Sequence, residues 1–251
     1  MQKLKNKVAL ITGATSGIGK ATAIDFIKNG ASVIVTGRFQ ESIDKTVVEL
    51  GEQASGIVSD AGKMNDLKQL GDKVKAISPQ IDVLFVNAGY GKYAPIEHID
   101  ERHYDEQFSV LVKGALFSVQ QIVPLMKPGG SIILNTSIVT EIGMKNSVVY
   151  SAAKAAVQSF AKTFASEMAP KEIRVNAISP GPIETNYFNR SNLTEAEIEG
   201  VADFVLPQVP LGRFGQPSEI AKVATFLASE DASFLHGAEI FVNGGFPNIK
   251  V

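Results

Sequence analysis

Residues 8–19 of this chain read Val-Ala-Leu-Ile-Thr-Gly-Ala-Thr-Ser-Gly-Ile-Gly, a short apolar run that leads directly into a glycine-rich turn. Residues 20–28 continue with a helical pattern. Glycines at positions 13, 17 and 19 let the backbone turn tightly and approach a pyrophosphate, while the amino end of a helix offers N–H donors to the anion. The spacing is Gly-x3-Gly-x-Gly rather than the commoner Gly-x-Gly-x-x-Gly. Its place between a strand and a helix favours a dinucleotide site over glycines that serve only helix–strand packing.

Short apolar and β-branched runs recur along the chain, and their near-continuous hydrophobicity is typical of strands covered on both faces. The predicted strands are Val8–Thr12, Ser32–Thr36, Ala54–Ser59, Ile81–Asn87, Ser131–Thr136, Ile173–Ser179 and Glu239–Val242. Between them, apolar residues three and four positions apart predict buried helix faces at Ala21, Ile24 and Ile27 and at Val157, Phe160, Ala161 and Phe164. This alternation predicts an α/β fold, with a Rossmann-type doubly wound, seven-stranded, mainly parallel sheet and helices on both faces.

No repeat, low-complexity tract or linker divides the 251 residues, so we expect a single dinucleotide-binding domain over residues 1–251. The longest stretch without a strand signal runs from Pro180 to about Gln216 and includes a capped helix pattern at residues 194–198. A long excursion within a compact domain is usually functional, so we expect a substrate-binding lid at about residues 183–210. A poorly ordered surface loop is the alternative interpretation.

Composition narrows the classes of partner. Lysine plus arginine (24) against aspartate plus glutamate (26) leaves a formal charge of -2, without the basic excess that nucleic-acid binding uses.

The apolar run from Val8 to Ile11 is too short for a secretory leader or a membrane helix, so neither is expected. The chain has no cysteine, which excludes disulfides, a thiol nucleophile and Cys-ligated metals and favours a cytoplasmic location. His98, His103 and His236 lack the spacing of a metal-binding helix, so no metal is expected.

The residues after the second predicted strand bear on which dinucleotide binds. An acidic residue there would bind the ribose hydroxyls of NAD, whereas an arginine would pair with the 2′-phosphate of NADP. Gly37 and Arg38 therefore favour NADP, with NAD left open because Arg38 could instead be a solvated charge that stacks on adenine. Two further turns follow the third and fourth strands, and either could be ordinary loop chemistry. They consist of Asp60 with Ala61, and of Asn87, Ala88 and Gly89.

Tyr150 and Lys154 lie one helical turn apart on the same predicted helix face. Proton transfer at neutral pH needs a tyrosine whose pKa lies well below its usual value of about 10, and an adjacent ammonium favours the phenolate. Ser137 follows the fifth predicted strand and could donate a hydrogen bond to a substrate carbonyl oxygen. A Tyr-x3-Lys pair alone is more often an ordinary helix surface, but its combination with Ser137 and the glycine turn indicates a catalytic site.

Together these motifs resemble the short-chain dehydrogenase/reductase family, in its compact single-domain branch. The resemblance covers about residues 5–246 and rests on several ordered motifs. They are Thr12–Gly19, Asn87–Gly89, Ser137, Tyr150 with Lys154, Arg174–Gly181, Gly212–Pro217 and Asn243–Gly245. The family resemblance implies an NAD(P)-dependent enzyme, a ketoreductase or alcohol dehydrogenase, that moves a hydride reversibly between NAD(P)H and a carbonyl. It also implies a homotetramer.

The same resemblance implies roles for individual residues. Ser137, Tyr150 and Lys154 would be catalytic: Ser137 orients the substrate oxygen, Tyr150 passes the proton and Lys154 binds the nicotinamide ribose. The glycine turn would hold the pyrophosphate, the turn at Asp60 the adenine, and the loop after the sixth strand the nicotinamide carboxamide. The implied cofactor-binding residues are Gly13, Thr15, Ser16, Gly17, Ile18, Gly19, Gly37, Arg38, Asp60, Ala61, Asn87, Ala88, Gly89, Tyr150, Lys154, Pro180, Gly181, Ile183 and Thr185.

The sequence departs from the family pattern at three positions. Val86 and Asn243 stand where the family usually has Asn and Asp, and both look like tolerable structural changes. Leu111 stands where the family generally has a catalytic Asn that holds a water linking the lysine to solvent. Leucine has no hydrogen-bonding group for that water. We therefore expect an active enzyme whose proton relay runs through main-chain carbonyls or other water.

Four other functions compete with this interpretation. A 3-oxoacyl thioester reductase of the same family stays open, whereas relatives that reduce the C=C bond of an enoyl thioester have a wider tyrosine-to-lysine spacing than Tyr150 and Lys154. A dinucleotide-binding regulator with weak activity would explain Leu111 but not the retained Ser137. A hydrolase is disfavoured because no serine lies in a Gly-x-Ser-x-Gly elbow.

The residues expected to line the substrate pocket are apolar and carry no fixed charge. They are Tyr187, Phe188, Phe204 and Leu206 in the predicted lid, with Val139, Ile142, Met144, Tyr90 and Tyr93 near the turns. This composition favours a small neutral carbonyl or alcohol substrate over a keto acid.

Overall fold

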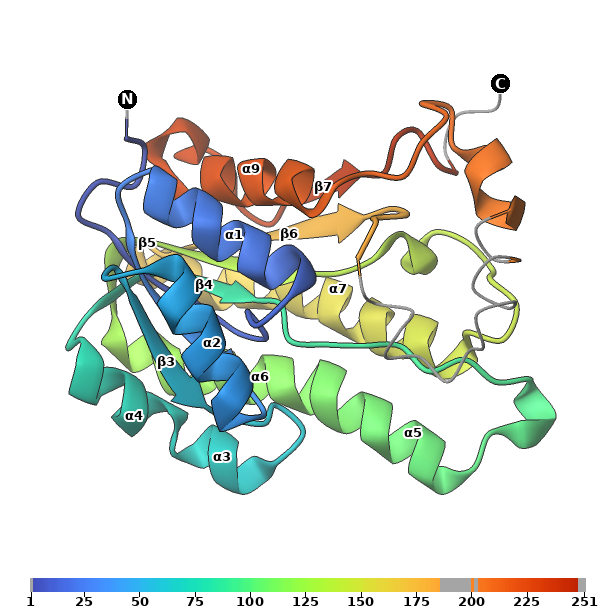
Figure 1. The fold of residues 1–251 in the computed structure, drawn as a ribbon, viewed down its shortest axis with the longest axis horizontal. Coiled ribbons are helices and arrows are strands. Elements are labelled where there is room, and N and C mark those ends of the chain that lie inside the picture. Colours follow the sequence, from blue (N-terminus) through green and yellow to red (C-terminus); the bar gives the residue numbers. More distant parts are fainter. Residues whose placement is uncertain (1, 186–199, 201–202, 248–251) are drawn as a thin grey trace.

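The structure is a computed structural model that describes residues 2–185, 200 and 203–247. Seven strands form one sheet in the order β3-β2-β1-β4-β5-β6-β7 (Figure 1). Every neighbouring pair is parallel. The strands are β1 Val8–Ile11, β2 Ser32–Gly37, β3 Ala54–Val58, β4 Ile81–Val86, β5 Met126–Asn135, β6 Arg174–Pro180 and β7 Glu239–Val242. The predicted doubly wound sheet is confirmed, and it is parallel throughout rather than mainly parallel.

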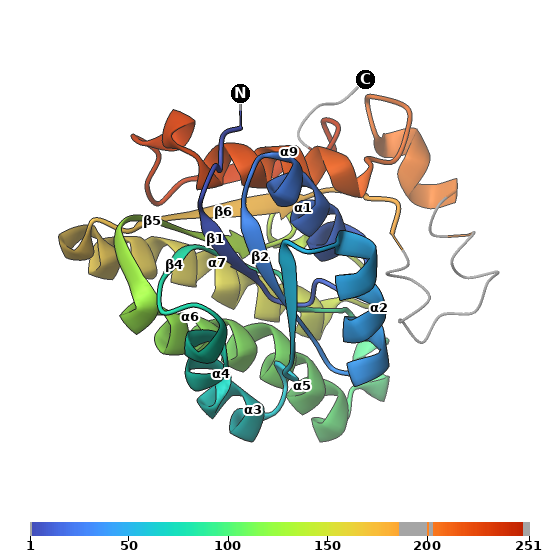
Figure 2. The ribbon, with the colours of Figure 1, turned by 60° about the vertical axis from the view of Figure 1, so that its left-hand side comes forward.

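Helices cover both faces of the sheet (Figures 1 and 2). On one face, α1, α2 and α9 bury their apolar residues in a core with alternate side chains of the strands. On the other face, α4, α6 and α7 form a second core with the remaining side chains. The α-helices are α1 Gly17–Lys28, α2 Gln40–Leu50, α3 Met64–Lys68, α4 Leu70–Ile77, α5 Glu101–Phe108, α6 Gly114–Ile122, α7 Val148–Met168 and α9 Pro217–Ala228. Because both sheet faces are buried, the strands read as the continuous apolar runs that predicted them.

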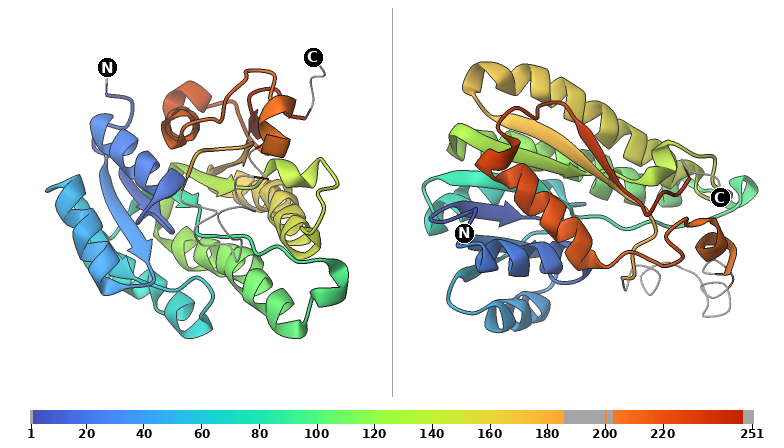
Figure 3. Two further views of the ribbon diagram at one scale, coloured as in Figure 1. Left: turned by 45° about the vertical axis from the view of Figure 1, so that its right-hand side comes forward. Right: turned by 90° about the horizontal axis from the view of Figure 1, so that it is seen from above.

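Shorter helical turns join these elements. The 3-10 turns are η1 Ile96–His98, η3 Val123–Leu125, η4 Ile138–Thr140, η5 Ala169–Lys171, η7 Leu206–Gln208 and η8 Glu230–Ala232. A π-helical segment, η2 Ser109–Lys113, connects α5 to α6. Figure 3 shows α7 running alongside β6, and α7 also begins next to η4. The start of α7 and the end of β5 therefore meet at the carboxyl edge of the sheet.

The predicted buried face of α1 was wrong. Ala21 and Ile27 are half-buried and Ile24 is exposed, whereas Thr22, Ala23 and Phe26 are buried. The helix sits close to the turn that precedes it: a Cβ at Gly19 would lie 2.5 Å from the Gly13 carbonyl oxygen. The predicted face was chosen from Ala21, Ile24 and Ile27, and it therefore missed Phe26, which lies on the buried face with the small residues Gly19, Thr22 and Ala23. The face predicted for α7 is confirmed, since Val157, Ala161 and Phe164 are buried there.

The segment Glu101–Leu125 is the one described helical stretch with the length and composition to cross a membrane. Core helices of soluble folds meet the same criterion. Here Ala115, Val119 and Ile122 are buried in the core between α4 and the sheet. The apolar character of this segment is thus accounted for by packing within the fold.

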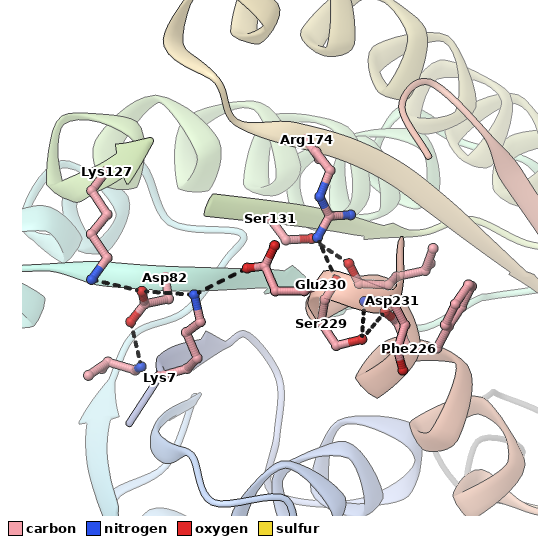
Figure 4. A network of polar contacts seen from close by, with 11 residues as sticks. Lys7, Asp82, Lys127, Ser131, Arg174, Phe226, Ser229, Glu230 and Asp231 are labelled. Carbon is pink, nitrogen blue, oxygen red and sulfur yellow. Dashed lines mark hydrogen bonds and ion pairs between the residues drawn. The ribbon is translucent and has the colours of Figure 1, made fainter. Parts of the chain in front are cut away.

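The amino ends of the strands are joined by an ionic network rather than by a binding site (Figure 4). Asp82, in β4, is buried, and its carboxylate accepts a hydrogen bond of 2.8 Å from the Val8 N–H. The same carboxylate lies 3.1 Å from Lys127 Nζ and 3.8 Å from Lys7 Nζ. Lys7 also lies 3.7 Å from Glu230. This network links the start of β1 to β4, β5 and the turn after α9.

Much of the predicted lid lies outside the described residues, including Tyr187, Phe188 and the helix pattern at residues 194–198. The described end of the segment can be placed. Val205 and Val209 pack with Ile138, Ile142 and Phe246. Phe204 and Leu206 were expected to line the pocket, but both are exposed. Consecutive residues in a helical turn cannot all face inward, and Val205 takes the inward position here.

Candidate active site

The glycine turn lies at the carboxyl end of β1, between the two strands that flank it. Gly13 and Gly17 have φ values of 65° and 54°, a backbone conformation that glycine adopts without strain. A Cβ at Gly13 would lie 2.7 Å from the Ala88 Cα, and one at Gly19 would meet the backbone of Gly13. Close packing of the turn therefore requires these glycines, which is in line with the alternative interpretation that they serve helix–strand packing. The same packing places the first N–H groups of α1 at the edge where an anion can bind them.

Side-chain hydrogen bonds tie this turn to the ends of the neighbouring strands. Thr12 Oγ1 accepts from the backbone N–H groups of Asn87 (2.9 Å) and Ala88 (3.0 Å). Asn87 Nδ2 donates to the carbonyl oxygens of Thr12 and Gly13, each at 3.1 Å. Asn135, at the end of β5, donates from Nδ2 to Asn87 Oδ1 at 2.9 Å. The ends of β1, β4 and β5 thus form one rigid unit.

A pocket at this unit gathers eight of the predicted cofactor residues, which come from four strand ends. They are Gly13, Thr15, Gly37, Arg38, Asp60, Ala61, Ala88 and Gly89. Ser59, Tyr90 and Val110 complete the lining and were not predicted as cofactor residues. Tyr90 had been expected at the substrate pocket. Tyr90 directly follows Gly89, and this position in the sequence could have predicted that it lines the same pocket as the expected cofactor residues.

Asp60 forms a tight turn after β3. Its Oδ1 accepts from the Gly62 N–H at 2.9 Å, and its own N–H donates to Asp66 Oδ2 at 2.8 Å. Gly114 closes the far side, because a Cβ there would lie 2.7 Å from the Ala61 carbonyl oxygen. These contacts fix the floor of the pocket before any ligand binds.

Tyr150 and Lys154 lie in the first turns of α7, and both side chains are buried. Lys154 Nζ lies 5.9 Å from the Tyr150 ring centroid and donates a hydrogen bond of 2.7 Å to the Asn135 carbonyl oxygen. Burial lowers the pKa of Lys154 from 10.5 to about 8. A buried ammonium next to a tyrosine is the arrangement that favours a phenolate during proton transfer.

Ser137 reaches the same edge from the turn after β5. It is buried and caps η4, where its Oγ accepts from the Val139 N–H at 3.4 Å. Because the oxygen acts as an acceptor there, the hydroxyl hydrogen is available to a substrate oxygen. The predicted serine, tyrosine and lysine therefore come from two consecutive elements at one edge of the sheet.

The loop after β6 returns to the glycine turn. The Thr185 Cβ lies 3.6 Å from the position that a Cβ on Gly17 would take. Ile183 forms an isolated parallel bridge with Gly215, and the Gly181 N–H donates to the Val242 carbonyl oxygen at 3.0 Å. This loop places Thr185 beside the predicted pyrophosphate site, while Pro180 and Gly181 lie next to β7.

An ion pair lies next to Gly215, the residue that forms the bridge with Ile183. Both terminal nitrogens of the Arg213 guanidinium, Nη1 and Nη2, donate to the Glu219 carboxylate at 2.8 Å. This pairing lowers the pKa of Glu219 to about 2. Glu219 also accepts from the Gln216 N–H at 2.7 Å, so the same carboxylate caps the start of α9.

Leu111 occupies the centre of the π-helical segment η2, so the backbone irregularity is present although the amide is not. The side chain is buried and packs with Val139, Tyr150 and Ala153. The position that a Gly89 Cβ would take lies 2.6 Å from Leu111 Cδ2 and 4.0 Å from Lys154 Nζ. Leu111 therefore packs near the Lys154 ammonium without offering it a hydrogen bond.

The predicted apolar pocket residues divide into two groups. Val139, Met144 and Tyr93 gather around Tyr150, and the Tyr93 and Tyr150 rings meet edge-on with centroids 6.0 Å apart. Ile142 packs instead beneath the described end of the lid segment. The wall beside Tyr150 is therefore aromatic and aliphatic.

A separate cavity of about 520 Å³ opens on the other side of Tyr93 and was not predicted. Its lining combines apolar surface with ionisable side chains, among them Lys92, His98, Arg102, His103 and Glu106. Lys92 and Arg102 both form ion pairs with Glu106, so one carboxylate offsets one of the two positive charges within the cavity wall. Among the described residues, no cluster of His, Asp and Glu could hold a metal ion.

The fold and the site define a class of protein. In doubly wound parallel sheets, ligands bind beyond the carboxyl ends of the strands, at the point where the strand order reverses. Here that point is β1, with β2 on one side and β4 on the other, and it carries the glycine turn. The protein is therefore a dinucleotide-binding α/β protein in which Tyr150 and Lys154 lie at the same edge of the sheet.

Comparisons with known proteins identify the family. A family model described as Enoyl-(Acyl carrier protein) reductase matches residues 13–247. The 3-oxoacyl-[acyl-carrier-protein] reductase FabG of Thermotoga maritima is 38% identical over 248 residues, which cover 97% of this chain and 98% of the relative. Oxidoreductase asL5 of Sarocladium schorii is 38% identical over 251 residues, 99% of each chain.

A solved structure agrees with these relatives. The 3-ketoacyl-(acyl-carrier-protein) reductase from Brucella melitensis, complexed with NADH, superposes with a TM-score of 0.88 at 29% identity, over 97% of this chain and 99% of that chain. The chain belongs to the short-chain dehydrogenase/reductase family, as its motifs predicted. It is an NAD(P)-dependent oxidoreductase of that family.

Proposed function

We propose that this enzyme reduces a neutral ketone to a secondary alcohol, reversibly, with Ser137, Tyr150 and Lys154 as its catalytic residues. The observation that carries the proposal is the burial of Tyr150 with the Lys154 ammonium 5.9 Å from its ring, at the sheet edge that Ser137 also reaches. A tyrosine and a lysine brought together in this way suit proton transfer to an oxygen.

The three side chains have distinct tasks in this mechanism. A bound nicotinamide dinucleotide supplies the hydride. Ser137 donates a hydrogen bond to the carbonyl oxygen, and Tyr150 gives its hydroxyl proton to that oxygen as the oxygen gains electrons. The Lys154 ammonium stabilises the tyrosinate that remains. Its hydrogen bond to the Asn135 carbonyl holds one N–H in place and leaves two for the ribose and for proton exchange.

The wall beside Tyr150 supports a substrate without a fixed charge, since Tyr93, Val139 and Met144 offer only apolar or aromatic surface near the ring. A 3-oxoacyl thioester is a second candidate, favoured by the name of the Thermotoga maritima relative. A panel of neutral ketones, keto acids and acyl thioesters, followed by cofactor absorbance, decides between them. A charged keto acid as the best substrate would overturn the neutral assignment.

The catalytic assignment is tested by Tyr150→Phe. Removal of a general acid typically costs a factor of about 10² to 10⁴ in turnover, and we expect a loss in that range with cofactor binding retained. Tight NADPH binding without turnover of any substrate by the unmodified enzyme would instead favour a dinucleotide-binding regulator.

We infer a preference for NADP from Arg38, which lines the predicted adenosine pocket with its guanidinium exposed. A guanidinium pairs with a 2′-phosphate through parallel hydrogen bonds, and NAD lacks that group. Measurement of kcat/KM with NADPH and NADH, repeated on Arg38→Ala, tests this preference. A higher kcat/KM for NADH in the unmodified enzyme would contradict it.

We also propose a single domain over residues 1–251, with residues 183–210 as a substrate lid, and a cytoplasmic homotetramer. The continuous sheet and the packing of Val205 and Val209 against Ile138, next to Ser137, support the domain and lid. The family resemblance supports the tetramer, with α7 and β7 at subunit contacts. A monomeric mass by light scattering at micromolar concentration would contradict the tetramer, and recovery in a membrane fraction would contradict the location.

A further inference from the structure

Two side chains reach toward each other across the predicted adenosine pocket. Arg38 follows β2 and Tyr90 follows the turn after β4, and these strands are the two neighbours of β1. The Arg38 Cζ lies 5.7 Å from the Tyr90 ring centroid and 5.4 Å from the Phe39 ring centroid. Both distances are within the range of a cation–π interaction. One guanidinium therefore contacts two aromatic rings, one from each side of the glycine turn.

Within the described part of the chain, the charge of Arg38 is not neutralised. Among the described residues, no carboxylate forms an ion pair with it. The acidic residue of the pocket, Asp60, has one carboxylate oxygen engaged by the Gly62 N–H. Contact with an aromatic face uses the plane of a guanidinium and leaves its N–H donors at the edge for an anion.

We propose that Tyr90, with Phe39, holds the Arg38 guanidinium in position to bind the 2′-phosphate of the cofactor, which makes Tyr90 a specificity-determining residue. The proposal rests on the proposed function, and in particular on its preference for NADP. An arginine side chain that is already held against two rings loses less rotamer freedom when it binds a phosphate. The rings therefore strengthen binding of the phosphorylated adenosine without contacting its phosphate.

The experiment measures binding of 2′,5′-ADP and of 5′-ADP to the full chain by calorimetry, which requires no turnover. We expect Tyr90→Leu to weaken 2′,5′-ADP binding by about three- to fivefold, the usual size of an exposed cation–π interaction, and 5′-ADP binding by less than about twofold. Tyr90→Phe keeps the ring and should retain the unmodified affinity for both ligands. Phe234→Leu removes a fully exposed aromatic ring elsewhere and serves as the matched control.

A double-mutant cycle separates this role from a general packing role. In an Arg38→Ala background, Tyr90→Leu should no longer distinguish the two ligands, because the group that it positions is gone. Equal weakening of both ligands by Tyr90→Leu, or no weakening of either, would overturn the proposal. If Tyr90→Leu does not fold, Phe39→Leu provides the same test, since Phe39 is exposed and contacts the same guanidinium.

The outcomes also separate this inference from the proposed function. The protein could bind 2′,5′-ADP selectively, lose that selectivity in Tyr90→Leu, and yet reduce no carbonyl. This result would support the inference and reject the proposed activity. Stronger binding of 5′-ADP than of 2′,5′-ADP by the unmodified protein would overturn the inference and the NADP preference, while NADH-dependent carbonyl reduction could still hold.

Discussion

Lys154 carries a positive charge where solvent is excluded. Its stem is enclosed by α7 and the sheet, and its Nζ donates to a main-chain carbonyl rather than to a carboxylate. Burial lowers its pKa to about 8, while the unfolded chain keeps the ordinary value of 10.5. Between these values the unfolded state binds more protons than the folded state, so stability rises with pH through this window. Below about pH 8 the full cost of the buried ammonium is present.

Lys154→Met removes that cost together with the ammonium that we propose to be catalytic. At pH 7 we expect the free energy of unfolding to rise by roughly 1 to 2 kcal/mol, since a pKa shift of this size is partly offset by the unpaired Asn135 carbonyl. The advantage should shrink as pH rises from 8 toward 10.5, while turnover is lost at every pH. Urea unfolding of both proteins at several pH values measures the difference in the free energy of unfolding. An equal loss of stability at all pH values would contradict this account.

Leu111→Asn restores the amide that the family generally carries at this position. We expect turnover with a good ketone to change by less than about twofold, because Lys154 already has a carbonyl acceptor in Asn135. A buried amide without hydrogen-bond partners should lower the free energy of unfolding by about 1 to 3 kcal/mol. Steady-state kinetics and thermal unfolding test both expectations, with Leu111→Met as the volume-conserving control. A larger gain in turnover would show that Leu111 limits proton transfer.

At the scale of an element, the glycine turn joins β1, α1 and the turn after β4 in one close contact. The Gly13 N–H donates to Thr36 Oγ1 at 3.3 Å, and the Ala14 N–H donates to the Thr36 carbonyl oxygen at 3.0 Å. The turn is thereby fixed to β2 as well. Any side chain at position 13 must displace the backbone of Ala88, which lines the cofactor pocket.

Gly13→Ala should therefore weaken NADPH binding by about tenfold or more, through strain at a positive φ and displacement of Ala88. The stability of the fold should fall by about 1 to 3 kcal/mol for the same reason. Fluorescence titration with NADPH measures the first effect. Gly143→Ala is the matched control, because its Cβ would point into open space and its φ is not positive. Unchanged binding in Gly13→Ala would show that the turn can widen freely.

At the scale of the whole molecule, the two edges of the sheet have different tasks. The carboxyl edge gathers the loops of the site, and the amino edge is joined by the ionic network around Asp82. The network connects the first strand to elements from the middle and the end of the chain, so it stabilises the sheet as one unit. Neither edge could take the other's role, because the glycine turn and the start of α1 lie only at the carboxyl edge.

Asp82→Ala should lower the free energy of unfolding by about 1 to 3 kcal/mol, because the Val8 N–H would lose its acceptor and the partly exposed Lys7 and Lys127 would lose an ion-pair partner. Cofactor binding at the opposite edge should be unchanged at temperatures where the variant is folded. Asp231→Ala removes the exposed partner of Lys3 and should cost less than about 1 kcal/mol. Similar losses for both variants in denaturant titrations would contradict a special role for Asp82.

The parts predicted well are those that depend on local patterns. Strand β7 begins and ends where the apolar run does, and β1 differs by one residue at Thr12. Ser137, Tyr150 and Lys154 meet because each follows a recognisable strand or helix start. The buried face of α1 was predicted wrongly, because more than one face of this helix carries apolar residues, and only the packing of the fold selects the face with Ala23 and Phe26.

The order of short apolar runs and glycine turns is a property of the sequence alone. It determined the doubly wound sheet, the family and the sheet edge at which the cofactor is expected, because parallel strands bring their carboxyl ends to one edge whatever the details of packing. Only the tertiary structure decided that Tyr90 faces Arg38 rather than the substrate wall, that Asn135 holds Lys154, and that Asp82 joins the opposite edge. These contacts join residues from different strands, and their distances depend on how the strands and helices pack together.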